Sequence, residues 1–345
     1  MMAQTFLNSS FPLTTNTPQA NQDWVINILD MVFNCGLLHC LSVSGVLANI
    51  INILILSKYG LRETTSLLLF SLSVSDLFCS LLQPIRRLHC IVAQFDPQLA
   101  NNMRSFTVVY FFPMPDIFVS ISILHTTVIA VERLVAVCAP LRVSRIFTPR
   151  RVKWLLLFLY LYVIVLMAPT LFLFDFFWTL DPSTNRTTGV FTLTQFYKSS
   201  YDSMNQYMNM GLTNLLVTFT LAVTIICSIV IGYKITVGRK STLVQLSSSV
   251  SKEVKDMKVI KMLLTVCVVN ACVSLPTVTI NLFLLYSNTL IQSSGKLYYL
   301  LRSFIIVLYQ LNASINFIIY ISMSSKFAST LNKLCLCTKK KTNNK

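Results

Sequence analysis

The chain alternates between long apolar stretches and short polar segments along most of its length. Seven stretches of about 20 residues or more carry at most one acidic or basic residue each, and a helix of that length crosses the apolar core of a bilayer, about 30 Å thick. They lie at residues 31–57, 64–85, 105–131, 154–174, 203–233, 262–286 and 303–322. Because backbone polar groups inside a membrane must be satisfied within the span, this pattern predicts seven transmembrane helices.

The polar segments at the two ends complete the domain organisation. Residues 1–30 are rich in Thr, Asn and Gln, so we expect a disordered N-terminal tail. Residues 31–322 form the transmembrane domain, and residues 323–345 predict a short amphipathic segment and a basic tail. The predicted fold is an all-α membrane protein, a seven-transmembrane helix bundle.

Composition and charge predict the orientation of the chain. Hydrophobic residues make up 54% of the 345 residues, and charged residues only 12%. Of the 28 Lys and Arg residues, 21 fall in alternate segments that include the C-terminal tail, and 7 fall in the others. Since basic loops stay in the cytoplasm, we expect a multi-pass plasma-membrane protein with its N-terminus outside. The net charge of +16 thus reports topology and does not indicate nucleic-acid binding.

Asp76 lies in the middle of the second span, where a charged group is costly. Such a carboxylate needs a cation, a proton or polar partners. Polar residues on other spans that can supply partners are Asn49, Ser122, Asn312 and Asn316. Two interpretations stay open: a sodium ion or proton in this cluster biases helix packing, or the cluster is a static polar contact between helices.

Glu132 and Arg133 stand side by side where the third span ends, in the sequence VERLVAVCAPL. Arg133 can fold back onto Glu132, or it can reach Asp256. Asp256 lies 20 residues before Pro276, a separation of about 30 Å along a helix, which places it at the inner end of the sixth span. The alternative is that Glu132 and Arg133 only anchor the span at the membrane interface.

Short motifs follow one another in a fixed order along these spans. Glu132-Arg133-Leu134 is followed by Pro140-Leu141, which begins eight positions after the acid. The second span contains LSVSD, ending at Asp76, and the seventh contains NFIIY, ending at Tyr320. Further matching positions are Asn49, Ser122, Tyr233, Pro276, Asn316 and Phe327. Together, from about residue 40 to 337, they resemble the motifs of the rhodopsin-like (class A) G-protein-coupled receptors.

This resemblance implies a function and roles for the motif residues. A receptor of this kind binds an extracellular ligand, here a neuropeptide or a small chemosensory molecule, and activates a heterotrimeric G protein, with arrestin and a receptor kinase as further partners. Glu132 and Asp256 would hold Arg133 in the silent state, and Tyr233 and Tyr320 would turn inward on activation. The Asp76 cluster would bind an allosteric sodium ion, and no other metal or cofactor is expected. A short amphipathic eighth helix would begin near Phe327.

Several positions depart from the family pattern. Val108 stands where the third helix usually carries an extracellular cysteine, and residues 175–206 contain no cysteine, so we expect the usual tether to the second outer loop to be missing. Cys90 is then expected to be a free thiol, and Cys35 a small buried side chain within a span. Ser274 replaces the usual switch tryptophan of the sixth helix. These departures are similar to those of divergent peptide-type and molluscan-type chemosensory receptors of invertebrates.

Charged residues near the outer ends of the spans are candidate ligand contacts. Arg86 and Arg87 lie about three turns outward of Asp76, and Arg302 lies near the outer end of the seventh span. They could pair with an acid of the ligand, whereas Asp116 could meet a cation, and both signs together would suit a peptide or a zwitterion. The alternative is that the arginines extend to lipid headgroups.

Four positions predict covalent modification. Asn8 and Asn185 begin Asn-x-Ser/Thr sequences in segments expected outside the cell, so they are candidate glycosylation sites. Cys335 and Cys337 follow the last span and are candidate palmitoylation sites, which would hold that segment against membrane lipid.

Other membrane-protein classes fit less well. A transporter or channel is the main alternative, but the chain shows no internal repeat and no pair of broken spans. An enzyme is not expected, because His39, His89 and His125 are scattered and lack a nucleophile or a metal-binding set beside them.

Overall fold

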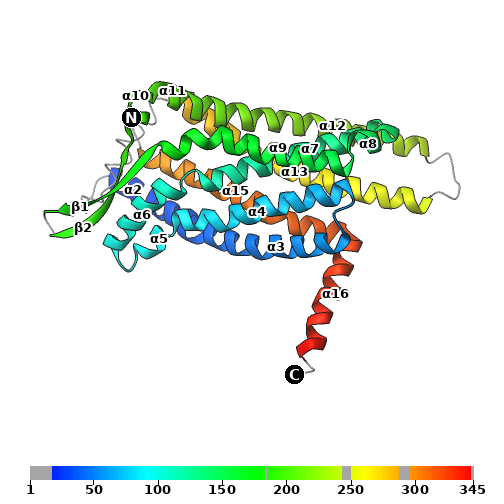
Figure 1. The fold of residues 1–345 in the computed structure, drawn as a ribbon, viewed down its shortest axis with the longest axis horizontal. Helices are drawn as coiled ribbons and strands as arrows, with labels where there is room; N and C mark the ends of the chain where they lie inside the picture. Colours follow the sequence, from blue (N-terminus) through cyan, green and yellow to red (C-terminus); the bar gives the residue numbers. More distant parts are fainter. Residues whose placement is uncertain (1–17, 183–184, 243–249, 287–294, 343–345) are drawn as a thin grey trace.

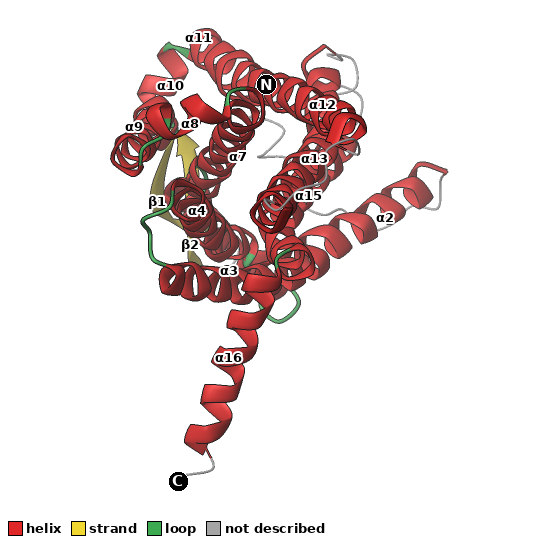
Figure 2. Cartoon of the chain, turned by 90° about the vertical axis from the view of Figure 1, so that its right-hand side faces the viewer, coloured by secondary structure: helices red, strands yellow, loops and turns green. Residues whose placement is uncertain are grey.

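The structure is a computed structural model that describes residues 18–182, 185–242, 250–286 and 295–342. Within those ranges seven helices are long and apolar enough to cross a membrane, which confirms the seven predicted spans. They run side by side in one bundle (Figure 1), and an end-on view shows them arranged as a ring, with α2 and α16 projecting away from it (Figure 2). The elements are α2 (Pro18–Met31), η1 (Val32–Leu37), α3 (Leu38–Tyr59), α4 (Thr64–Arg87), α5 (His89–Val92), α6 (Pro97–Phe111), α7 (Met114–Cys138), α8 (Pro140–Ile146), α9 (Pro149–Met167), η2 (Ala168–Phe172), β1 (Phe174–Asp181), β2 (Arg186–Leu193), α10 (Gln195–Ser199), α11 (Tyr201–Gln206), η3 (Tyr207–Leu216), α12 (Val217–Thr242), α13 (Val250–Tyr286), α15 (Gly295–Met323) and α16 (Ser325–Thr342).

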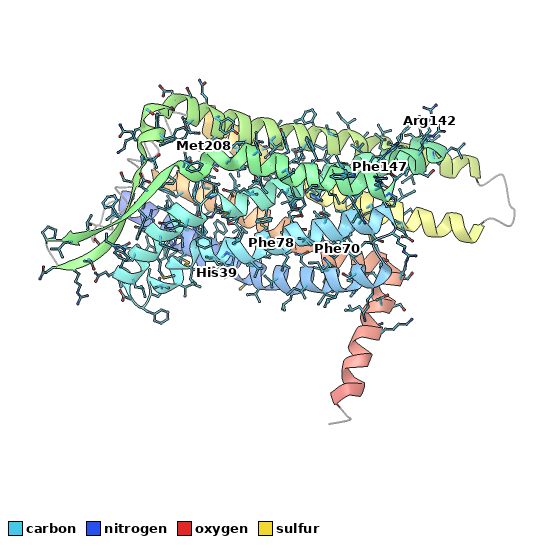
Figure 3. The ribbon with its side chains drawn as sticks, viewed as in Figure 1. His39, Phe70, Phe78, Arg142, Phe147 and Met208 are labelled. Atoms are coloured by element: carbon cyan, nitrogen blue, oxygen red, sulfur yellow. A yellow bond between two sulfur atoms is a disulfide. The ribbon has the colours of Figure 1, made fainter. Side chains whose placement is uncertain are left out.

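The two ends of the bundle differ in structure. One end carries β1, β2, α5 and α6, and the other carries α8 and the start of α16 (Figure 1). His39 and Met208 lie toward the first end, whereas Arg142 and Phe147 lie at the second (Figure 3). We refer to them as the hairpin end and the α16 end.

The first span begins earlier than the sequence predicts. Residues 18–30, expected to be disordered, form most of α2, which continues through η1 into α3. Asp30 Oδ1 accepts hydrogen bonds from Ser303 Oγ, 2.7 Å, and from Asn34 Nδ2, 2.8 Å, so the end of α2 is tied to α15. The prediction was wrong because it rested on the polar composition of the whole tail, whereas the second half of the tail contains apolar residues that extend the helix. They include Trp24, Val25, Ile28 and Leu29.

The third predicted span is not one helix. Residues 105–131 were expected to be continuous, but α6 ends at Phe111 and α7 starts at Met114, with Pro113 between them. Proline has no backbone N–H and its ring clashes with the preceding turn, so it interrupts the helix. Asp96 begins α6 by accepting hydrogen bonds from the N–H groups of Gln98 and Leu99, both 2.9 Å.

An antiparallel hairpin, β1 paired with β2, follows the fourth span and is not part of the all-α prediction. The register pairs Phe174 with Leu193 at the base and Asp181 with Arg186 at the tip. The N–H of Gly189 donates to Asn102 Oδ1 of α6, 2.8 Å, and a Cβ at Gly189 would lie 2.9 Å from the Phe176 ring. The ring of Phe176 also packs edge-on against that of Phe106 in α6, with centroids 6.0 Å apart. The hairpin is therefore held to α6 by an aromatic contact and a hydrogen bond, and no disulfide in the described ranges joins them.

Apolar packing fills the half of the bundle toward the α16 end. Leu68, Leu72, Ile129 and Leu263, from three different helices, are fully or almost fully buried in one cluster. Nearer the middle, α3 approaches α4 and α15 closely at Gly45, where an added Cβ would lie 2.5 Å from Ser80 Oγ and 2.6 Å from Ser314 Oγ. Such close packing fixes the relative positions of the helices that carry the polar site.

Candidate functional site

The structure brings two of the predicted core residues into contact with Asp76, which is completely buried in α4. Ser122 of α7 donates to Oδ1 at 2.6 Å, and Asn316 of α15 donates Nδ2 to Oδ2 at 2.8 Å. Three helices therefore meet at one carboxylate. Because a buried charge is stabilised only by such partners, this contact depends on the presence of all three side chains.

The other two predicted core residues lie nearby without bonding to that carboxylate. Asn49 donates Nδ2 to the carbonyls of Gly45 and Ala313, at 3.0 and 2.9 Å, and so joins α3 to α15. Asn312 is buried, but among the described residues it is not a hydrogen-bond partner of Asp76. Of the five residues predicted to form one cluster, Asp76, Ser122 and Asn316 thus contact one another through the carboxylate. Asn49 forms a separate contact that joins α3 to α15.

The donor chemistry around Asp76 fits a monovalent hard cation. A carboxylate oxygen and a hydroxyl oxygen lie 2.6 Å apart, and hard cations prefer oxygen ligands. The described residues contain no group of three or more His, Cys, Asp or Glu side chains able to hold a metal ion. The Asp76 oxygens and Ser122 Oγ are the oxygen atoms that would hold a sodium ion, and its presence stays a prediction.

At the α16 end of the third span, Arg133 is held by two side chains. Its Nε and Nη2 donate to the two carboxylate oxygens of Glu132, and both residues are buried. Nη2 also donates to Thr65 Oγ1 at 2.6 Å. Thr65 lies in the first turn of α4, and the sequence interpretation missed it because nothing in the local pattern distinguishes it from its neighbour Thr64. We call Glu132, Arg133 and Thr65 the arginine latch.

The remaining residues predicted to act with Arg133 are not gathered around it. Tyr320 is buried in α15 and its ring lies 5.7 Å from that of Phe327, centroid to centroid. Tyr233 of α12 is 65% exposed and faces away from the bundle. Asp256 belongs to α13, but its side chain lies outside the described part of the structure.

The charged candidates at the hairpin end pair differently from one another. Arg86 Nη1 lies 3.1 Å from Asp116 Oδ2, an ion pair between α4 and α7. Arg302 of α15 donates to Asn281 Oδ1 and to the hydroxyl of Tyr298, both at 3.1 Å. Arg87 has a buried Nε with no hydrogen-bond partner in the structure. Arg86 is thus paired with an acid, whereas Arg302 is hydrogen-bonded to neutral groups.

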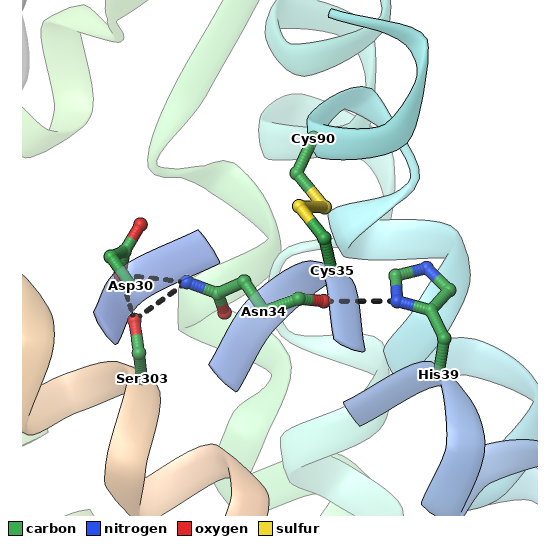
Figure 4. The surroundings of a disulfide bond; sticks show 6 residues. All are labelled: Asp30, Asn34, Cys35, His39, Cys90 and Ser303. Atoms are coloured by element: carbon green, nitrogen blue, oxygen red, sulfur yellow. Dashed lines mark hydrogen bonds between the residues drawn. A yellow bond between two sulfur atoms is a disulfide. The ribbon is translucent and has the colours of Figure 1, made fainter. Parts of the chain in front are cut away.

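Cys90 is not a free thiol. It forms a disulfide with Cys35 of η1, with their Cα atoms 5.8 Å apart (Figure 4). The prediction was wrong because Cys35 was assigned to the buried part of the first span, whereas the early start of that span brings it to α5 at the hairpin end. Beside it, Asn34 donates to Ser303 Oγ at 2.7 Å, and its carbonyl lies 2.9 Å from His39 Nδ1.

The predicted modification sites are only partly described. Asn185 lies exposed in the turn between β1 and β2 with φ of 53°, a conformation that asparagine tolerates. Asn8 lies outside the described residues. Cys335 and Cys337 fall within α16, but their side chains are outside the described part.

Comparison with known proteins shows the family to which the chain belongs. The family model described as 7 transmembrane receptor (rhodopsin family) matches residues 47–320. The chain belongs to the rhodopsin family of seven-transmembrane receptors. A stretch of 140 residues is 31% identical to the human (Homo sapiens) motilin receptor, covering 39% of this chain and 32% of that receptor.

Membership of this family favours a receptor over the alternatives. The family is a class of receptors and not of enzymes, and it does not favour a transporter or channel. The matched range begins in α3 and ends at Tyr320 in α15, so it contains the Asp76 contact and the arginine latch. The receptor is a multi-pass membrane protein.

Proposed function

We propose that this receptor binds an extracellular ligand at its hairpin end and activates a heterotrimeric G protein at its α16 end. In this orientation the N-terminus is outside and the C-terminus is cytoplasmic. The distribution of Lys and Arg along the sequence supports it. The exposed position of Asn185, a candidate glycan acceptor on the hairpin, is compatible with it as well.

The observation that carries this proposal is the arginine latch. A guanidinium bound by a carboxylate and a hydroxyl is well stabilised only while all three groups stay in place. Because Thr65 lies on α4 and Arg133 on α7, a shift of either helix breaks the contact. The latch is thus a two-state element that ligand binding at the other end can bias.

In the active state Arg133 leaves the latch and becomes available to the G protein. Movement of α13 away from α7 would open the α16 end, and Tyr233 and Tyr320 would turn toward the opened space. Asp256 would strengthen the silent state from α13. Basic residues of the loops at this end would attract the G protein.

For the ligand we favour a peptide over a small chemosensory molecule. The resemblance to the motilin receptor supports the peptide class. The proposed contacts lie in the parts of α4, α7 and α15 nearest the hairpin end: Arg86, Arg87, Asp116 and Arg302. A small zwitterionic molecule is the second candidate, favoured by the proximity of both charge signs at Arg86 and Asp116.

Further partners follow from the same proposal. A sodium ion held by Asp76 and Ser122 would favour one packing of α4, α7 and α15. Palmitoyl chains on Cys335 and Cys337 would fasten α16 to membrane lipid. Arrestin and a receptor kinase would act at the same end of the bundle as the G protein.

The test is nucleotide exchange by purified heterotrimers mixed with the receptor in nanodiscs. We expect one class of G protein to exchange nucleotide faster with the receptor than without it, and a peptide library to raise that rate further. Arg133→Ala, which removes the guanidinium but keeps the helix, should abolish both effects. If no heterotrimer responds under any stimulus, the coupling proposal is wrong. Antibody access to an N-terminal epitope on intact cells tests the orientation separately.

A further inference from the structure

The hydrogen bonds of Arg86 occupy acceptors on three neighbouring residues, and two buried N–H donors at this site have no acceptor. Its Nη2 donates to Gln83 Oε1 at 2.9 Å, and Nη1 donates to the Phe112 carbonyl at 2.9 Å and to Asp116. Since the amide oxygen of Gln83 faces the guanidinium, its Nε2 is the free end. That Nε2 and the Nε of Arg86 are buried and have no partner in the structure.

The same arrangement recurs at Arg302, but without an acid. Asn281 turns Oδ1 toward the guanidinium, so its Nδ2 is free, and this nitrogen is buried without a partner. The guanidinium also lies over the Tyr298 ring, 5.4 Å from its centroid. No carboxylate of the described residues lies within ion-pair distance of Arg302. Its charge is therefore balanced only by neutral groups.

The two groups belong to one region of the bundle. Tyr309 of α15 packs against a buried cluster that includes Cys79 of α4, Val119 of α7 and Val278 of α13, which lie one helical turn from Gln83, Asp116 and Asn281. Of the helices involved, α15 contacts α4, α7 and α13, and α7 contacts α4 and α13. On the side of this cluster toward the hairpin end lie three unpartnered donors, Gln83 Nε2, Arg86 Nε and Asn281 Nδ2, and the guanidinium of Arg302. Asp116 is already paired with Arg86, and Asp30 of α2, which reaches α15 at Ser303, accepts hydrogen bonds from Ser303 and Asn34.

We infer that this region recognises a carboxylate of the ligand, through Arg302 and Asn281 and with the donors beside Arg86 as further contacts. An ionised carboxylate is acceptor-only and can take two parallel hydrogen bonds from a guanidinium. It would also match the net positive charge. An ammonium group would meet the uncompensated Arg302 and would have to compete with Arg86 for Asp116. The inference rests on the proposed ligand-binding role of the hairpin end.

The carboxylate could be the C-terminus of a peptide or part of a small organic acid. The first step of the test measures the local electrostatic potential and requires no ligand. Tyr309→Cys places a reporter thiol on α15, about two turns from Arg302 and beside the cluster that borders both charged groups. Its reaction rate with anionic sulfonatoethyl methanethiosulfonate, divided by that with the cationic trimethylammonioethyl reagent, reports the local potential. The unsubstituted receptor gives the background from the exposed Cys40, Cys138 and Cys272. If Tyr309→Cys does not fold, Asn281→Cys serves as the reporter.

We expect this rate ratio to exceed that of free cysteine severalfold, and Arg302→Gln to remove most of the excess. Arg186→Gln is the matched control, because it removes a cation from the exposed hairpin at the same end. It should leave the ratio unchanged. A ratio at or below that of free cysteine, or one insensitive to Arg302→Gln, overturns the inference.

The second step uses protection of the reporter thiol by defined probes at millimolar concentration. The probes are acetylated tripeptides with free C-terminal carboxylates, the same peptides as amides, hexanoate and hexanamide. We expect the acids, and not the amides, to slow the reaction, and Arg302→Gln to abolish the difference. Protection by the peptide acids alone assigns a peptide C-terminus, and protection by hexanoate as well assigns a simple carboxylate. Equal effects of acids and amides overturn the inference.

Neither step involves a G protein. Failure of nucleotide exchange with a positive result here would therefore overturn the coupling proposal and leave carboxylate recognition standing. Nucleotide exchange with a negative result here would overturn carboxylate recognition and leave the coupling proposal standing.

Discussion

Thr65 gives the sharpest test of the arginine latch. Thr65→Val replaces the hydroxyl by a methyl group of similar shape, so the packing at the start of α4 is kept and only the 2.6 Å hydrogen bond to Arg133 is lost. The two hydrogen bonds to Glu132 stay. The substitution therefore weakens the silent state without removing any residue proposed to contact the G protein.

The size of the effect follows from the charge and the burial. A hydrogen bond to a charged group contributes about 1.5–3 kcal/mol, and an unpartnered buried donor costs a similar amount. Arg133 is 9% exposed, but Thr65 is only partly buried, so water can replace some of the lost bond and the lower value, about 1.5 kcal/mol, applies. That energy raises the ratio of active to silent receptor about tenfold. Starting from a minor state of about 1%, about a tenth of the receptor would then be active without ligand.

The assay is the initial rate of agonist-free nucleotide exchange at matched receptor concentration in nanodiscs. Thr64→Val is the control, because it makes the same change one position away, at a residue with no hydrogen bond to Arg133 in the structure. We expect the basal rate of Thr65→Val alone to rise about tenfold, in proportion to the active fraction. Equal basal rates for the two variants and the wild-type receptor would refute the idea that Thr65 helps to hold the silent state.

Three further predictions concern stability and ion binding. Gly45→Ala should lower the thermal midpoint, because overpacking costs about 1–3 kcal/mol, whereas Gly232→Ala, with open space around it, should not. Replacing Na⁺ by choline should lower the midpoint of the wild-type receptor but not that of Asp76→Asn; equal sensitivity of both would remove the sodium site. Cys35→Ser and Cys90→Ser should each lose the same stability, at most about 4 kcal/mol, and the double variant no more than either; additive losses would contradict the disulfide.

Much of the candidate site could be predicted from the sequence. Asp76 stands out as an acid in an apolar span, and its partners Ser122 and Asn316 match positions of a known family. The pairing of Glu132 with Arg133 could be predicted without knowledge of the tertiary structure, since the side chains of adjacent residues can reach each other. For these residues local pattern and family motif were sufficient.

Other contacts could not be predicted because they join residues far apart in the chain. Thr65 and Arg133 are 68 residues apart, and Cys35 and Cys90 are 55 residues apart. Polar side chains such as Thr65 occur at the ends of many spans, and nothing local selects the one that faces an arginine. The carboxylate inference has the same origin, because the free amide nitrogen of Asn281 follows from the position of Arg302 on another helix.

The sequence by itself determined the seven spans and the acid in the second, because helix length and the cost of burying charge in a bilayer act residue by residue. It also contained Pro113, whose effect on the third span was underestimated. The tertiary structure alone decided which helices lie side by side. It therefore decided the disulfide, the attachment of the hairpin to α6 and the groups that hold Arg133, since these depend on distances between helices that no local pattern encodes.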